Sequence, residues 1–141
     1  VMLGGGDARA DVDAALARHA GRVTLPGPVP LEQVPDWMAA ADIVALASWA
    51  EGTPNVLLEA LACGRRVVAT RVGGIPDVVT HPALGHLVPP RDIDALAAAL
   101  RLALDEPYVP ADIAQRATGS SWDASALAVR EVLAAAIAER T

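Results

Sequence analysis

The sequence predicts a single α/β domain built on a doubly wound, parallel sheet. Short apolar segments typical of strands alternate with segments of helical spacing, and this order places helices on the faces of a parallel sheet. Ile43 to Ala47 is a continuous apolar run, typical of a strand that is buried on both faces. The chain has 141 residues, of which 53% are hydrophobic. That size and composition suit one domain with a packed core.

The first forty residues are expected to form two strand–helix units. The elements are a strand at Val1 to Leu3, a helix at Asp11 to Ala20, a strand at Val23 to Leu25 and a helix at Leu31 to Ala41. Gly4-Gly5-Gly6 follows the first strand directly, and Gly21 is a typical helix stop. Pro26-Gly27-Pro28 closes the second strand.

Residues 43 to 90 continue the same alternation, and the remainder is expected to be helical. The expected strands are Ile43 to Ala47, Val67 to Thr70 and Gly85 to Val88. The expected helices run from Thr53-Pro54 to Gly64, from Pro76 to Thr80, from Asp92 to Leu104, from the turn around Pro107 and Pro110 to Ala117, and from Trp122 to Glu139. Thr53 is expected to cap the first of these helices, with Pro54 in its first turn. Asp42 is expected at a strand entrance.

Composition excludes several classes of function. The net charge is −6, so general binding to nucleic-acid phosphates is disfavoured. All 11 basic residues are Arg, which removes lysine-dependent Schiff-base and P-loop chemistry. The single cysteine, Cys63, cannot form an internal disulfide, and no signal peptide or membrane-spanning run is recognisable. We therefore expect a cytoplasmic protein that binds no nucleic acid.

The most informative segment joins the strand at Ile43 to Ala47 to the helix that follows it. Ligands bind at the carboxyl edge of an open α/β sheet, where this segment begins. Glu51 precedes a helix whose free first-turn N–H groups can bind an anion, and Gly52 allows close backbone approach. Asn55 and Glu59 are four residues apart, hence on one helix face. Two carboxylates and an anion site predict a ligand with both phosphate and hydroxyl groups, although a single Glu near a helix start is usually only solvated.

These residues resemble the donor-site signature of the family 4 (group 1) retaining glycosyltransferases, in which two Glu residues are separated by seven others after a buried strand. The resemblance rests on Glu51-Gly52-Thr53-Pro54, Leu57-Leu58-Glu59-Ala60, Val72-Gly73-Gly74-Ile75-Pro76-Asp77 and Gly85-His86-Leu87-Val88-Pro89-Pro90, and it extends along essentially the whole chain, including Ser121-Trp122. It implies that residues 1–141 are the donor-binding, C-terminal Rossmann-like half of a two-domain GT-B enzyme.

The resemblance also implies the roles of individual residues. Glu51 would contact the donor sugar as the catalytic residue, and Glu59 would bind the ribose hydroxyls of the nucleotide. The backbone of Gly52, Thr53, Pro54 and Asn55 would face the sugar and the diphosphate, while Gly5 and Val29 would approach the donor cleft and the nucleobase. The implied reaction transfers a hexose from a nucleotide diphosphate sugar, most commonly a UDP-sugar, with retention and without a metal ion or other cofactor. The acceptor is not implied.

Two parts of the family pattern do not occur in this chain. Family members have one more strand, followed by a loop with an Arg and a Lys that clamp the diphosphate. That strand would lie between Val1–Leu3 and Ile43–Ala47, so we expect a domain truncated at its N-terminal side and lacking its first strand. The acceptor domain is also absent, and the final helix is expected to pack toward it. We expect no transfer by these residues alone, and peripheral membrane association through the absent domain stays open.

The glycine, histidine, arginine and tryptophan residues outside this signature allow other interpretations. Gly4-Gly5-Gly6 has the wrong spacing for a dinucleotide fingerprint, and Gly73-Gly74 suits either a turn or a ligand contact. The three histidines have no metal-ligand spacing, and Arg65 and Arg66 are expected to be a solvated pair at a helix end. Trp37, Trp49 and Trp122 are expected to be packing residues, with Trp49 also able to line a sugar pocket. A nucleotide-sugar epimerase and a degenerate, non-catalytic domain remain as alternative functions.

Overall fold

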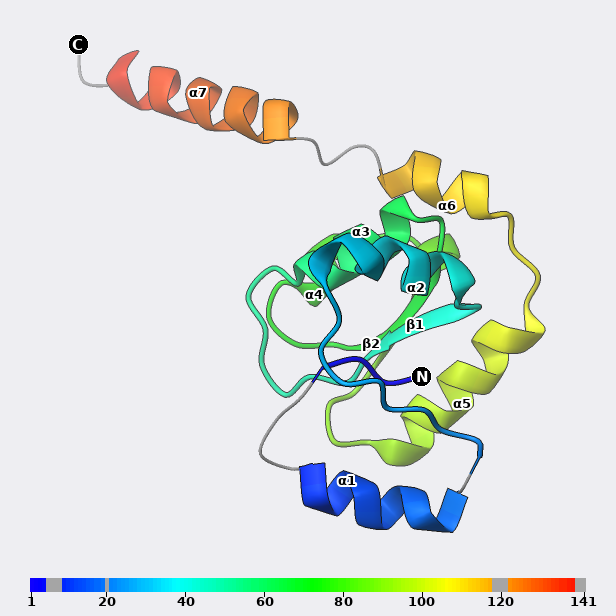
Figure 1. The fold of residues 1–141 in the computed structure, drawn as a ribbon. Helices are drawn as coiled ribbons and strands as arrows, with labels where there is room; N and C mark the ends of the chain where they lie inside the picture. The colour runs from blue at the N-terminus through cyan, green and yellow to red at the C-terminus, as the bar shows by residue number, and fades with distance from the viewer. Residues whose placement is uncertain (5–8, 20, 118–121, 139–141) are drawn as a thin grey trace. The chain divides into compact units, whose positions relative to one another are not determined.

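The computed structural model describes residues 1–4, 9–19, 21–117 and 122–138 of the chain. By its internal contacts the chain divides into two compact units, Val1–Trp37 and Met38–Thr141. The second unit holds a three-stranded parallel sheet with helices around it, so the expected α/β class with a parallel sheet is confirmed (Figure 1).

The first unit contains little regular strand. Leu3 and Gly27 form one isolated parallel bridge, supported by a hydrogen bond from the Met2 N–H to the Thr24 carbonyl (2.9 Å). The strands expected at Val1 to Leu3 and Val23 to Leu25 are therefore wrong as extended elements. Each segment has only three residues, which is the lower limit of usual strand length.

The helices of this part of the chain differ in their bounds from those expected at Asp11 to Ala20 and Leu31 to Ala41. Helix α1 spans Arg9–Leu16 and continues as a 3-10 turn at Ala17–His19. A second 3-10 turn, Leu31–Gln33, leads into α2, Val34–Ala40. The helix expected from Leu31 to Ala41 is thus present with a tighter first turn, because Pro35 lacks an N–H and cannot close an i→i−4 bond.

The sheet of the second unit has the order β1-β2-β3, with β1 at Ile43–Leu46, β2 at Arg66–Thr70 and β3 at Gly85–Val88. All five residues of β2 are buried. Because successive side chains of a strand point to opposite faces, both faces of β2 must be covered. Helices α3, Asn55–Ala62, and α5, Ile93–Asp105, both pack on β2 and supply the two covers (Figure 1).

The core lies between these helices and the central strand. Its largest fully buried side chains are Leu57, Leu61, Ile75, Ile113, Val67 and Val68. Helix α4, Ile75–Val78, contributes Ile75, and α6, Pro110–Ala117, contributes Ile113. Gly64 ends α3 in a left-handed conformation (φ 71°), as the sequence predicts. The core is therefore built on the strand–helix–strand unit that carries Glu51 and Glu59.

The final helix, α7, spans Trp122–Ala138. Between Leu127 and Ile137 its large apolar side chains are exposed, from 50% at Leu127 to 69% at Val132, and the packing role expected of Trp122 lies outside the described side chains. No helix among the described segments is both long enough and apolar enough to cross a membrane.

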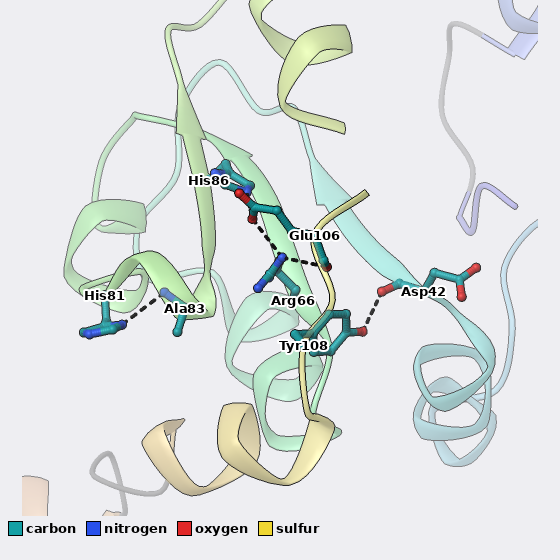
Figure 2. Close-up of polar contacts among 7 residues, drawn as sticks. All are labelled: Asp42, Arg66, His81, Ala83, His86, Glu106 and Tyr108. Atoms are coloured by element: carbon teal, nitrogen blue, oxygen red, sulfur yellow. Dashed lines mark hydrogen bonds and ion pairs between the residues drawn. The ribbon is translucent and has the colours of Figure 1, made fainter. Parts of the chain in front are cut away.

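A polar cluster ties the amino ends of the three strands together (Figure 2). The Arg66 guanidinium, 8% exposed, donates through Nη1 to the Glu106 carboxylate (3.0 Å) and to the Glu106 carbonyl (3.2 Å). It also stacks over the Tyr108 ring at 4.9 Å, and the Tyr108 hydroxyl donates to the Asp42 carbonyl (2.6 Å). The solvated pair expected at Arg65 and Arg66 is therefore wrong for Arg66, whose partner lies forty residues further along the chain.

His86 joins the same cluster from β3 without a hydrogen bond. Its Nε2 is buried and lies 3.3 Å from the Glu106 carboxylate, but it makes no hydrogen bond. The contact is an ion pair only when the imidazole is protonated. The cluster lies at the amino ends of the strands, opposite to the carboxyl ends where Glu51 lies, and its contacts join segments that are far apart in the sequence.

Replacing Glu106 by alanine is expected to lower the free energy of unfolding by about 1 to 2 kcal/mol, because it leaves the buried Arg66 charge without its carboxylate partner. The value is at the low end for a buried pair because the Glu106 side chain is itself 43% exposed and its attraction is screened. Urea unfolding measures the change. Asp105→Ala, at the neighbouring exposed position, is the matched control, and an equal loss in both variants would contradict the role given to Arg66.

Candidate functional site

The loop between β1 and α3 carries the first predicted carboxylate. Glu51 is half-buried, and its Oε1 accepts a hydrogen bond from the Ser48 hydroxyl at 2.6 Å. Ser48 follows β1 by two residues, so the pair lies at the carboxyl edge of the sheet. The structure therefore puts Glu51 at the edge where the sequence predicts it, with a side-chain partner that the sequence analysis did not identify.

Thr70 connects this loop to the neighbouring strand. It is the last residue of β2, is 4% exposed, and donates its hydroxyl to the Ser48 carbonyl at 2.6 Å. The ladder between β1 and β2 ends at the pair Leu46 and Ala69. The Thr70 hydroxyl therefore holds the chain beyond the last paired residue of β1.

The loop after β2 packs directly against the Glu51 loop through main-chain atoms. The Gly74 N–H donates to the Gly52 carbonyl at 2.9 Å. Gly73 has φ 50°, and a Cβ at this position would lie 1.8 Å from the Glu51 carbonyl oxygen. Of the two roles open for Gly73-Gly74, the structure thus supports a close turn, and the turn braces the loop that carries Glu51.

The amino end of α3 differs from the expectation in one respect. Pro54 occupies the cap position (φ −78°, ψ 100°), and no side chain caps the helix. The cap expected at Thr53 is therefore wrong, because Thr53 precedes the cap position by one residue and its hydroxyl bonds to no first-turn N–H. Asn55 and Val56 are exposed in that first turn. An uncapped helix start retains the N–H donors and partial positive charge that bind anions.

Asn55 and Glu59 lie on α3 as predicted. They are four residues apart, which puts their side chains on one face of the helix, and both are exposed. A single strand–loop–helix unit thus carries Glu51, Gly52, Thr53, Pro54, Asn55 and Glu59. Their contacts with a ligand stay predictions.

The two predicted residues in the first unit are not tested by this geometry. Gly5 lies outside the described residues. Val29 is half-buried within Val1–Trp37, a unit separate from the one that carries Glu51. Their approach to a nucleotide stays a prediction.

Trp49 is not the packing residue that the sequence suggests. Its side chain is 73% exposed, and the Arg91 guanidinium lies over the ring at 5.1 Å. Arg91 has φ 63°, a left-handed conformation that is uncommon outside glycine. That Trp49 lines a sugar pocket stays a prediction.

The described part of the chain shows no group of three or more His, Cys, Asp or Glu side chains that could hold a metal ion. His81 instead accepts a hydrogen bond from the Ala83 N–H through Nδ1 (3.0 Å), within a turn (Figure 2). Cys63 is a free thiol at the carboxyl end of α3.

Comparison with known proteins gives one family. Residues 1–106 match the sequence profile of the family described as glycosyl transferases group 1. The D-inositol 3-phosphate glycosyltransferase of Streptomyces scabiei is 39% identical over 114 residues, which are 78% of this chain and 26% of that protein. The enzyme of the same name from Kineococcus radiotolerans is 38% identical over a match of 99% of this chain and 37% of that protein.

Solved structures agree with the sequence matches. The sucrose-phosphate synthase of Thermosynechococcus elongatus superposes with a TM-score of 0.76 at 28% identity, over 97% of this chain and 38% of that one. The Anabaena protein HepE in complex with UDP superposes with a TM-score of 0.71 at 27% identity, over 94% of this chain and 37% of that one. The chain thus spans between a quarter and two fifths of the proteins to which it is similar.

Proposed function

This chain belongs to the group 1 glycosyltransferases, and on that premise we propose that it forms the nucleotide-sugar-binding half of a retaining GT-B enzyme. The proposed donor is a UDP-hexose, and an acceptor domain outside these 141 residues completes the enzyme. The observation that carries the proposal is the strand–loop–helix unit in which Glu51, the uncapped start of α3 and Glu59 follow one another at the carboxyl edge of the sheet. The complex of the related HepE with UDP supports the choice of nucleotide.

Each part of the unit has a proposed task. The Glu59 carboxylate accepts hydrogen bonds from the two ribose hydroxyls, which an ionised carboxylate does well. The first-turn N–H groups of α3 stabilise the negative charge that develops on the departing diphosphate. The Glu51 carboxylate accepts hydrogen bonds from the sugar hydroxyls as the bond from the anomeric carbon to the diphosphate oxygen lengthens and the ring takes on oxocarbenium character. This division of tasks needs no metal ion.

The proposal also covers the compartment of the enzyme and the domain that contacts the acceptor. We propose a cytoplasmic enzyme whose contact with an acceptor, and any peripheral contact with a membrane, is made by the acceptor domain. The 141-residue chain alone is expected to release no UDP from a UDP-hexose, because it lacks that domain and the Arg and Lys that clamp the diphosphate in the family pattern.

Replacing Glu59 by alanine is expected to weaken UDP binding about tenfold or more, because two charge-assisted hydrogen bonds to the ribose are lost. Isothermal titration calorimetry of the intact protein that contains this chain measures the affinity. Glu131→Ala, an exposed Glu in the middle of α7, is the matched control and should bind UDP as the unsubstituted protein does. Binding that is indifferent to Glu59, or no binding by the intact protein, would favour the non-catalytic alternative.

A further inference from the structure

We infer that Ser48 is a positioning residue for the Glu51 carboxylate and that Thr70 holds Ser48 in place; the inference rests on the function proposed for Glu51. Two hydrogen bonds form the connection. The Thr70 hydroxyl donates to the Ser48 carbonyl, and the Ser48 hydroxyl donates to Glu51 Oε1, each at 2.6 Å. The carboxylate is thereby tied through two side chains to the central strand of the sheet.

The bond from Ser48 restricts a side chain that would otherwise sample many conformations. A glutamate has three rotatable side-chain bonds, and an unrestrained one in a surface loop distributes among many rotamers. A short bond from a hydroxyl to a charged carboxylate is among the stronger hydrogen bonds in proteins. It engages Oε1 alone, and an ionised carboxylate has about four acceptor positions. Glu51 can therefore accept sugar hydroxyls while Ser48 fixes its direction.

The bond from Thr70 holds the backbone at Ser48, where the hydrogen bonds of the sheet have already ended. Parallel pairing of β1 with β2 ends at Leu46 and Ala69, so the backbone at Ser48 lies beyond the ladder. Thr70 is buried (4% exposed) and β-branched, so its hydroxyl has little freedom to leave the Ser48 carbonyl. On the other side of Glu51, the Gly74 N–H fixes the Gly52 carbonyl. The backbone is thus held on both sides of Glu51, and Ser48 sets the side chain between them.

The test measures UDP release by the intact protein from the fastest-used of three donors, UDP-glucose, UDP-galactose and UDP-N-acetylglucosamine. Ser48→Ala is expected to lower kcat about tenfold and to leave the affinity for UDP unchanged, because UDP lacks the sugar that Glu51 contacts. Ser48→Thr retains a hydroxyl at the same atom position and is expected to recover most of the rate. In a Glu51→Ala background, Ser48→Ala is expected to cause no further loss, because the two residues act as a unit.

The Thr70 position gives an independent pair of variants. Thr70→Val removes the hydroxyl at nearly constant shape and is expected to lower kcat in the same way, whereas Thr70→Ser keeps the donor and is expected to retain most of the rate. Should Ser48→Ala fail to fold, this pair carries the test, with thermal melting showing which variants are folded.

The possible outcomes distinguish a failure of the positioning role of Ser48 from a failure of the proposed function. A folded Ser48→Ala variant with the unsubstituted kcat, or with a loss that persists in the Glu51→Ala background, overturns the positioning role. An equal loss of UDP affinity and rate also overturns it, because the effect is then on the whole site. No UDP release and no UDP binding by the unsubstituted protein overturns the proposed function itself, and the inference with it.

Discussion

Replacing Glu51 by alanine is expected to lower sugar transfer by the intact protein at least about 100-fold while UDP affinity changes less than about twofold. The expected size follows from an interaction that strengthens as positive charge develops on the sugar ring, because only contacts that are stronger in the transition state raise kcat. UDP itself carries no sugar, so its binding should not depend on this carboxylate. Steady-state release of UDP from a UDP-hexose and calorimetry with UDP measure the two quantities.

A second variant and a stability measurement show whether the lost rate comes from the Glu51 carboxylate itself or from unfolding. Glu51→Gln keeps the size and one acceptor oxygen, so an intermediate rate is expected if the charge and the hydrogen bonds both contribute. The melting temperature of Glu51→Ala should stay close to that of the unsubstituted protein, because the side chain is half-buried and its loss leaves only the Ser48 hydroxyl without its acceptor. Transfer at the full rate by the alanine variant would assign the chemistry to another residue.

Replacing Gly73 by alanine is expected to lower the free energy of unfolding by about 3 kcal/mol. Part of the loss comes from the left-handed backbone (φ 50°), which costs an alanine about 1 to 2 kcal/mol. The rest comes from a methyl group that would lie 1.8 Å from the Glu51 carbonyl oxygen and must force the two loops apart. Urea unfolding measures the loss.

Gly52→Ala is the matched control for this change. Gly52 lies in the adjoining loop, but its φ is not in the left-handed range and a Cβ there would meet nothing within 4 Å. It is expected to change stability by less than about 1 kcal/mol. Equal stability of the Gly73 and Gly52 variants would show that the loops separate freely and that the contact does not hold Glu51.

The parts of the fold that the sequence predicts best are those with local causes. The three strands of the sheet are short segments rich in Val, Leu, Ile and Ala, and β1, β2 and β3 lie within one residue of the expected bounds. Helix α5 begins as expected, because Asp92 accepts a hydrogen bond from the Ala95 N–H (2.8 Å) as a local cap. Such signals are contained in a few neighbouring residues.

The features that the sequence analysis missed depend on residues far apart in the chain. Arg66 looks like a solvated helix-end residue until its partner Glu106 is known. Ser48 and Thr70 are 22 residues apart, and neither shows its role alone. A usable signal was nevertheless present: both are hydroxyl residues at or just beyond the carboxyl end of a strand, and neighbouring parallel strands bring these ends together. Thr53 was misjudged for a local reason, because Pro54 takes the cap position itself.

The way the Glu51 loop is held bears on how donor preference could be changed. Two hydrogen bonds hold its backbone, from the Thr70 hydroxyl to the Ser48 carbonyl and from the Gly74 N–H to the Gly52 carbonyl, and Gly73 packs too close to the Glu51 carbonyl to admit a Cβ. None of them uses the exposed side chains of Thr53 or Asn55. A library that varies only these two positions would therefore leave the loop backbone intact, which makes them the natural starting points for changing the donor of the proposed enzyme.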